Sequence, residues 1–143
     1  MSWKTKKVKK VISKKIRKSK KVIDKPWNSG TMTNAGFFGM IRAALRQKSR
    51  WWKPVAECKK LAKRKYTGLN KKQRFEYQCN LCKSWFPEKE ISVDHKIEAG
   101  QLNKLEDLPG FVKRLFCEVD GLQVLCDECH QNKTNLYKLK LKK

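Results

Sequence analysis

Two short cysteine pairs constrain the fold of this chain more than any other feature. Cys79 and Cys82 form the first pair, and Cys126 and Cys129 form the second. Two CxxC pairs can supply four thiolates to one tetrahedral ion, which is the donor set of a closed structural zinc site. Because residues 83–125 lie between the pairs, the intervening chain must fold as a layer and not as a short finger loop.

The cysteine content leaves alternatives open. Six cysteines can form a disulfide framework in a secreted protein, but paired CxxC spacing fits a metal better. Cys117 is a rival ligand, although no second cysteine lies at CxxC spacing from it. Each CxxC pair with its turn is called a knuckle below. His130 follows Cys129 directly and can replace a thiolate as the fourth ligand. The sequence therefore predicts one structural zinc, with the four paired cysteines as the preferred ligands.

The charge of the chain indicates its partner. The formal net charge is +23 in 143 residues, with a pI near 10.0. A protein this basic binds polyanions at neutral pH, and nucleic acid is the default partner. No apolar run approaches the roughly 18 residues that a membrane span needs, and no apolar segment follows the basic N-terminus. We therefore expect a cytoplasmic protein that binds nucleic acid and has no membrane partner.

Composition divides the chain into three predicted parts. Residues 1–30 form a lysine-rich, flexible tail that lies along phosphates; an amphipathic helix on anionic membrane is the alternative. Residues 31–70 form a basic helical segment, read as a hairpin of two helices over 34–66. The Trp51-Trp52 pair is expected to pack in the core, with base stacking as the minority view. Residues 71–143 carry the cysteine pairs.

The last part has the pattern of two strands and a helix around the knuckles. Ile91 and Val93 alternate with polar residues before Asp94-His95, as in a half-buried strand. Residues 122–125 predict a second strand before Cys126. A helix is expected from Asp127 to the C-terminus, and a short helix after Pro109-Gly110. The fold class is therefore α+β.

The dipeptide Asp94-His95 at the predicted strand end has the chemistry of phosphodiester hydrolysis. A carboxylate binds a hard divalent cation, which neutralises charge on the phosphate. An imidazole titrates near neutral pH and can take a proton from water. Such a dipeptide alone is weak evidence, but here it lies between two knuckles in a very basic chain. His95 and His130 are the only histidines.

These residues carry a family resemblance. Val93-Asp94-His95, together with the segment Gly121-Leu122-Gln123-Val124-Leu125-Cys126-Asp127-Glu128-Cys129-His130-Gln131-Asn132-Lys133-Thr134, resembles the zinc-stapled, phage-type branch of the HNH endonucleases. The resemblance covers roughly residues 75–137. It implies a ββα-metal (His-Me finger) core, in which two strands and a helix surround one catalytic cation. The implied product of cleavage carries a 5′-phosphate and a 3′-hydroxyl.

The resemblance also implies roles for individual residues. His95 corresponds to the general base, and Asp94 and His130 to ligands of a catalytic Mg²⁺ or Mn²⁺. The four paired cysteines correspond to the structural zinc ligands. One position departs from the family pattern, because Gly121 stands where the family has an asparagine that braces the loop bearing the base. Asp120, Asn132 or Asn135 can substitute, and restoring the asparagine by Gly121→Asn is expected to raise or preserve cleavage.

The predicted function is therefore a metal-dependent DNA endonuclease that holds DNA mainly through its phosphate backbone. The predicted backbone contacts are Lys133, Arg42, Arg46, Lys63 and Arg64. Two other functions stay open at this point. One is a non-catalytic zinc-ribbon protein that binds DNA or RNA, which the lysine excess and the missing asparagine favour. The other is a packaging factor of a phage, with terminase or another packaging protein as partner and the host cytoplasm as location. The sequence says nothing of oligomeric state.

Overall fold

The computed structural model describes residues 21–143, in two units that are taken separately below. The predicted tail helix falls mostly on residues 1–20, outside the described part. The first unit ends at Asn34 and contains a tight turn between Trp27 and Met32. Asn28, Ser29 and Gly30 all have positive φ in this turn, which suits asparagine and glycine best.

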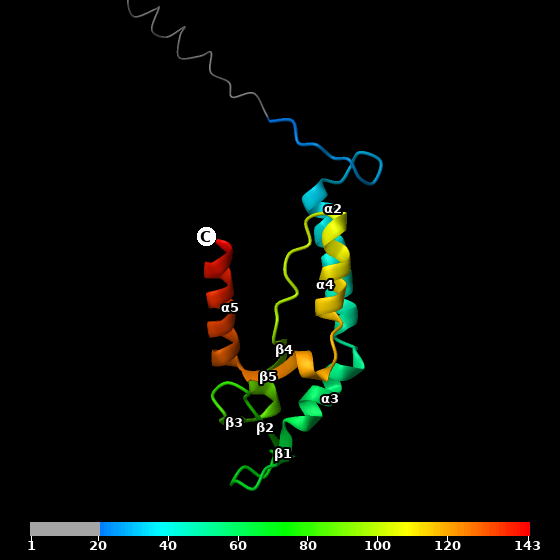
Figure 1. Ribbon diagram of the computed structural model, residues 1–143. Coiled ribbons are helices and arrows are strands. Elements are labelled where there is room, and N and C mark those ends of the chain that lie inside the picture. Colours follow the sequence, from blue (N-terminus) through cyan, green and yellow to red (C-terminus); the bar gives the residue numbers. More distant parts are fainter. Residues whose placement is uncertain (1–20) are drawn as a thin grey trace, which may run out of the picture. The chain divides into compact units, whose positions relative to one another are not determined.

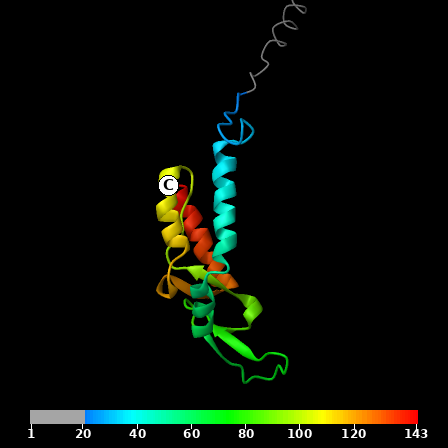
Figure 2. The same ribbon diagram turned by 90° about the vertical axis from the view of Figure 1, so that its right-hand side faces the viewer.

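The unit Ala35–Lys143 is α+β, as predicted, and Figures 1 and 2 show its elements. Its helices are α2 (Asn34–Ser49, whose first residue belongs to the first unit), α3 (Lys53–Leu61), α4 (Leu108–Leu115) and α5 (Asp127–Leu141), and its strands are β1 (Lys63–Lys65), β2 (Phe75–Gln78), β3 (Trp85–Phe86), β4 (Ile91–His95) and β5 (Leu122–Cys126). Short 3-10 turns, η1 (Glu88–Glu90), η2 (Leu105–Asp107) and η3 (Val119–Gly121), join them.

Strands β4 and β5 form the antiparallel pair that positions the predicted site. The register places Asp94 opposite Gln123 and His95 opposite Leu122. All five residues of β5 are buried, whereas β4 is half-buried. Because β5 ends at Cys126 and α5 begins at Asp127, strand and helix follow one another without a loop. Both strands and the final helix lie where the sequence predicted them.

Helices α2 and α3 pack in two different hydrophobic cores. Phe38 of α2 packs with Phe111 and Leu115 of α4 and with Ala99 and Leu102 of the connecting loop. Cys58 of α3 packs instead with Tyr77 of β2 and with Leu122 and Val124 of β5. The predicted helical hairpin is therefore wrong in its packing: each helix buries its apolar face against a different partner. The second helix also stops at Leu61, where β1 takes over.

The two adjacent tryptophans have opposite environments. Trp52 packs edge-to-face on Phe116, with ring centroids 5.5 Å apart, and its Nε1 donates to the Cys117 carbonyl at 2.8 Å. Trp51 is 86% exposed. Core packing is thus confirmed for Trp52 and wrong for Trp51. Pro54, in the first turn of α3, helps to fix this boundary because proline is favoured at helix starts.

A second, three-stranded sheet in the order β1-β2-β3 carries the first cysteine pair. β1 pairs antiparallel with β2, and β2 with β3, so that Tyr77 lies opposite both Lys63 and Phe86. The three residues of β1 are basic and exposed, and β1 is an edge strand. Among the described residues, no helix has the length and apolar character required to cross a membrane.

Candidate metal centre and the neighbouring acid–imidazole cluster

The first knuckle is the turn between β2 and β3. The main-chain N–H of Lys83 donates to the carbonyl of Cys79 at 3.0 Å, and the N–H of Cys79 donates to the carbonyl of Ser84 at 2.9 Å. Lys83 has φ near 60°, the left-handed conformation that lets the chain reverse sharply. The turn therefore holds the side chains of Cys79 and Cys82 on one side.

The second knuckle is the junction between β5 and α5. Cys126 is the last residue of the strand and the N-cap of the helix, and Cys129 lies in the first helical turn. The N-terminus of a helix carries partial positive charge from its unpaired N–H groups, which favours thiolates. This knuckle is therefore built by the change from strand to helix, and not by a separate loop.

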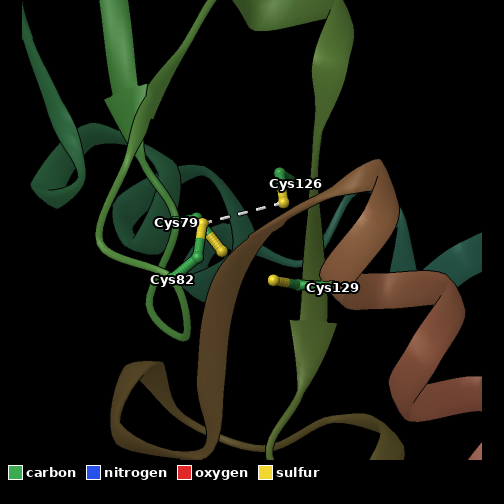
Figure 3. A group of neighbouring side chains, drawn as sticks. All are labelled: Cys79, Cys82, Cys126 and Cys129. Carbon is green, nitrogen blue, oxygen red and sulfur yellow. Dashed lines mark hydrogen bonds between the residues drawn. The ribbon is translucent and has the colours of Figure 1, made fainter.

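The four thiols converge on one point, as Figure 3 shows. Their sulfur atoms all lie within 4.8 Å of one another, and Sγ of Cys82 is 4.0 Å from Sγ of Cys126. A tetrahedral zinc with bonds of about 2.3 Å needs its sulfurs about 3.8 Å apart. The donor set and the spacing thus fit a structural metal such as zinc. The prediction that these four cysteines come together is confirmed.

The acidity of the thiols is uneven across the cluster. Burial opposes ionisation of Cys79, but hydrogen bonds from the main chain of Cys126, Cys82 and Leu81 and from the Cys82 thiol lower its pKa to about 6. Hydrogen bonding to Cys126, with burial, raises the pKa of Cys129 to about 12. Burial also raises the pKa of Cys126. One negative charge is stabilised readily, and further thiolates need a cation among them.

The other two cysteines, of which Cys117 was the predicted rival ligand, lie elsewhere. Cys58 is buried in the core beneath α3, and the Cys117 sulfur lies next to Gly121. Neither belongs to the thiol cluster, and burial raises the pKa of both. All six cysteines are free thiols, so the disulfide alternative is not borne out.

Asp94 and His130, the predicted ligands of a catalytic cation, lie beside the thiol cluster. Asp94, at 9% exposure, is the penultimate residue of β4, and His130 is at the end of the first turn of α5. His130 Nε2 is 3.8 Å from Asp94 Oδ1. His130 therefore faces the carboxylate while Cys129, its neighbour in sequence, supplies a thiol to the cluster. The predicted proximity of these two side chains is present.

Lys133 is the residue whose contacts sequence reasoning missed. Its Nζ donates to Asp94 Oδ2 at 2.5 Å, to Glu98 Oε1 at 3.0 Å and to the main-chain oxygen of His95. Burial opposes its charge, but the hydrogen bonds to Asp94 and Glu98 raise its pKa. The sequence did contain part of this information, because His130 and Lys133 are three residues apart in the predicted helix and so share one helix face. The phosphate contact predicted for Lys133 stays a prediction, and its ammonium is engaged within the chain.

His95 is held by a single ring nitrogen. Nε2 lies 2.8 Å from the main-chain oxygen of Leu115, at the end of α4. A carbonyl can only accept a hydrogen bond, so Nε2 carries the proton and Nδ1 keeps its lone pair in the neutral ring. This contact fixes both the tautomer and the orientation of the imidazole.

No family model, curated protein or solved structure matches this chain. The HNH resemblance therefore rests on the sequence motifs alone. Within residues 21–143, the only group of three or more histidine, cysteine or acidic side chains placed to share a metal is the thiol cluster. Asp94 and His130 offer a second ion two donors.

Gly121 has a packing reason that the sequence did not reveal. A Cβ at this position would lie 2.8 Å from Sγ of Cys117 and 3.1 Å from its Cβ, too close for an undisturbed contact. Its φ is not positive, so the backbone conformation at this position does not itself require glycine. Its carbonyl accepts from the N–H of Lys96 at 2.9 Å. Gly121→Asn therefore introduces a clash with Cys117, and its expected effect on cleavage stays a prediction.

The other predicted DNA contacts lie on two surfaces. Arg42 and Arg46 are on α2, where the Arg46 guanidinium is 5.8 Å from the ring of Phe111. On β1, Lys63 Nζ lies 3.7 Å over Phe75, and Arg64 lies 3.6 Å over Trp85 while its Nε donates to Glu76 at 2.6 Å. These contacts orient the cations, and DNA binding by them stays a prediction.

Proposed function

We propose that the chain is a metal-dependent DNA endonuclease of the HNH type, which hydrolyses phosphodiester bonds. One observation carries the proposal. Asp94 at the end of β4 and His130 at the start of α5 lie 3.8 Å apart, and the imidazole of His95, the residue after Asp94, has a fixed tautomer. Two strands followed directly by a helix hold all three side chains, as the resemblance implies for a ββα-metal core.

In this proposal His95 is the general base. Its Nε2–H is occupied by the Leu115 carbonyl, so the lone pair at Nδ1 is available to accept a proton from water. The hydrogen bond that fixes the ring also stabilises the imidazolium formed when Nδ1 takes the proton. The proton has a defined destination, and the ring need not reorient between turnovers.

Asp94 and His130 are the proposed ligands of the catalytic cation. One carboxylate oxygen and one imidazole nitrogen at 3.8 Å can both reach a single ion, since Mg²⁺ binds its ligands at about 2.1 Å. When bound, Mg²⁺ or Mn²⁺ would supply the positive charge that stabilises the phosphate during hydrolysis. Nearly half of the His130 side chain is exposed, which leaves room for substrate on that side.

The four cysteines are proposed to hold zinc in a structural role. Four thiolates would fill the tetrahedral coordination of zinc and leave no position for substrate. The ion would tie the β2–β3 turn to the start of α5, and therefore hold His130 and Lys133 in place. Elemental analysis of the purified protein would identify the bound metal.

DNA is the proposed substrate because of the charge of the chain. The net charge of +23 is spread over several elements. One concentration is the β1–β2 hairpin with its loop, residues 63–78, where six cations occur: Lys63, Arg64, Lys65, Lys71, Lys72 and Arg74. Of these, Arg64 pairs with Glu76. Such a surface binds phosphates without reading bases, so weak sequence preference is expected.

Cleavage of supercoiled plasmid tests the proposal. Zinc-loaded protein is incubated with DNA and a series of divalent cations, and nicked and linear products are followed. Wild type should cleave with Mg²⁺ or Mn²⁺, and His95→Ala should lose nearly all activity while binding DNA with unchanged affinity. Equal cleavage by wild type and His95→Ala, or none by either, would exclude this enzyme.

A non-catalytic nucleic-acid-binding protein is the second candidate, and one observation favours it. Asp94 is already neutralised by Lys133 at 2.5 Å, which lowers its attraction for a cation. The glycine at position 121 also removes the family's brace. Binding of Mn²⁺ separates the two candidates, because only the nuclease requires an ion that depends on both Asp94 and His130.

A further inference from the structure

The ammonium of Lys133 lies in a pocket of three oxygens. It donates to Asp94 Oδ2 at 2.5 Å, to Glu98 Oε1 at 3.0 Å and to the carbonyl of His95. The side chains of Lys133, Asp94 and Glu98 are 20%, 11% and 30% exposed. These contacts join α5 to the end of β4 and to the loop that follows it. The ammonium is thus largely removed from solvent and fully engaged.

The same three oxygens would suit a divalent cation. Hard cations select carboxylate and carbonyl oxygens, and two carboxylates with one carbonyl form such a set. Asp94 contributes to both sides of this arrangement. Its Oδ2 faces Lys133, and its Oδ1 faces His130 Nε2 at 3.8 Å. Without the ammonium, an oxygen-only site would compete for the ion that needs His130.

We propose that Lys133 is a positioning residue that fills this three-oxygen pocket and so confines a divalent cation to the side of Asp94 that faces His130. The inference rests on the proposed function, because it concerns the cation of that site. Lys133 acts in two ways. It fixes the rotation of the Asp94 carboxylate, and its positive charge offsets one of the two negative charges of Asp94 and Glu98, so that the pair attracts a cation less strongly.

A phosphate contact is the competing role for Lys133, and it makes different predictions. A lysine that binds DNA contributes to affinity whether or not a divalent cation is present, and its removal reduces the salt dependence of binding. A lysine that fills the pocket leaves DNA affinity unchanged in the absence of added cation. Its removal changes where, and how tightly, the cation binds.

The experiment titrates Mn²⁺ into the full-length, zinc-loaded protein without DNA and follows free Mn²⁺ by electron paramagnetic resonance. Lys133→Met should bind Mn²⁺ about tenfold more tightly than wild type or more, because a positive charge beside two carboxylates is removed. The gain should survive in Lys133→Met/His130→Ala and disappear in Lys133→Met/Glu98→Gln. Lys140→Met makes the same charge change at an exposed position of α5 and should match wild type.

Several outcomes would overturn the proposal. Mn²⁺ affinity in Lys133→Met that equals or falls below that of wild type would do so, and so would a gain that survives Glu98→Gln. Weaker DNA binding by Lys133→Met than by Lys140→Met, with unchanged Mn²⁺ affinity, would assign Lys133 to phosphate instead. Bound zinc and circular dichroism verify folding. If the methionine variant does not fold, Lys133→Gln, whose amide can still donate to the carboxylates, should show the same gain.

Cleavage assays separate this inference from the proposed function. If wild type cleaves no DNA with any cation, the nuclease proposal fails, and the Mn²⁺ titrations still decide the role of Lys133. If wild type cleaves, Lys133→Met should cleave more slowly although it binds Mn²⁺ more tightly. Tighter binding with slower cleavage is the result that a merely structural lysine would not produce.

Discussion

The thiol cluster could be predicted from the sequence, whereas the acid–imidazole cluster of Asp94, Glu98, His130 and Lys133 could be predicted only in part. Helix α5 contributes residues to both clusters. Each CxxC turn places two donors by local geometry, so the thiol cluster needs only one long-range relation between two turns. The second cluster takes Asp94 from a strand, Glu98 from a loop and His130 and Lys133 from a helix. Its geometry depends on strand register and helix direction together. The difference explains why spacing alone revealed the first centre and missed half of the second.

The largest expected effect comes from removing one thiolate. Cys126→Ser should lose the bound metal and the fold together, since structural zinc contributes about 10–16 kcal/mol, as much as a whole small domain is worth. Metal content by elemental analysis and a thermal unfolding scan measure both effects. Cys58→Ala, a cysteine outside the cluster, is the control and should keep its metal. A folded, metal-free Cys126→Ser would show that the thiols are not a structural centre.

Removing His130 should break the second cluster and leave the first intact. His130→Ala is expected to weaken Mn²⁺ binding roughly 10–100-fold, by analogy with changes close to other metal ions, and to keep the zinc. The change in unfolding free energy should stay within about 0.5 kcal/mol, because the side chain is 45% exposed. Loss of zinc in this variant would instead make His130 a ligand of the cysteine centre.

Filling the space at position 121 tests the packing behind β5. Gly121→Asn should lower the free energy of unfolding by about 1–3 kcal/mol, because the new Cβ collides with the Cys117 sulfur. Urea unfolding measures the change. Gly121→Asn/Cys117→Ala should recover part of it, since alanine removes the colliding atom. A fully stable single variant would mean that the Cys117 side chain moves aside at no cost.

The smallest effect is expected from surface charge that belongs to neither cluster. Lys71→Ser/Lys72→Ser, in the loop between β1 and β2, should reduce the log–log salt slope of DNA binding by up to about 0.9 for each phosphate that is no longer neutralised. Fluorescence anisotropy at several salt concentrations measures the slope. Zinc content and Mn²⁺ affinity should not change. Lys142→Ser/Lys143→Ser removes the same charge at the chain end, and an equal reduction there would deny the hairpin any special role.

The sequence predicted the elements whose own residues carry a periodic signal. Ile91 and Val93 alternate with polar residues, and β4 forms there. The sheet β1-β2-β3 carries no such signal, because Lys63-Arg64-Lys65 is an exposed edge strand without alternation. The prediction that α2 and α3 form a hairpin was wrong, because helical periodicity shows which face of a helix is apolar but not which element covers that face. Phe38 packs against α4, whereas Cys58 packs against β5.

In the candidate site, too, the sequence predicted only the residues that belong to a recognisable motif. Asp94 and His130 were foreseen because the motif contains them, and they lie close together. Glu98 lay outside every motif, and its contact with Lys133 forms only once the loop after β4 folds back toward α5. The reason for Gly121 was equally hidden, since it depends on the sulfur of a residue four positions earlier in the chain.

The burial of β5 sets a limit on how this molecule can be divided. Leu122 and Val124 are covered by the helix that carries Cys58, while Leu125 packs beside Cys79 and Phe86. A fragment that starts at residue 71 would keep every proposed catalytic and metal ligand and yet strip the cover from one side of that strand. The segment before residue 71, which includes α3, therefore covers part of the core beneath the proposed site. Replacing this segment with another DNA-binding module would require new side chains to cover Leu122 and Val124.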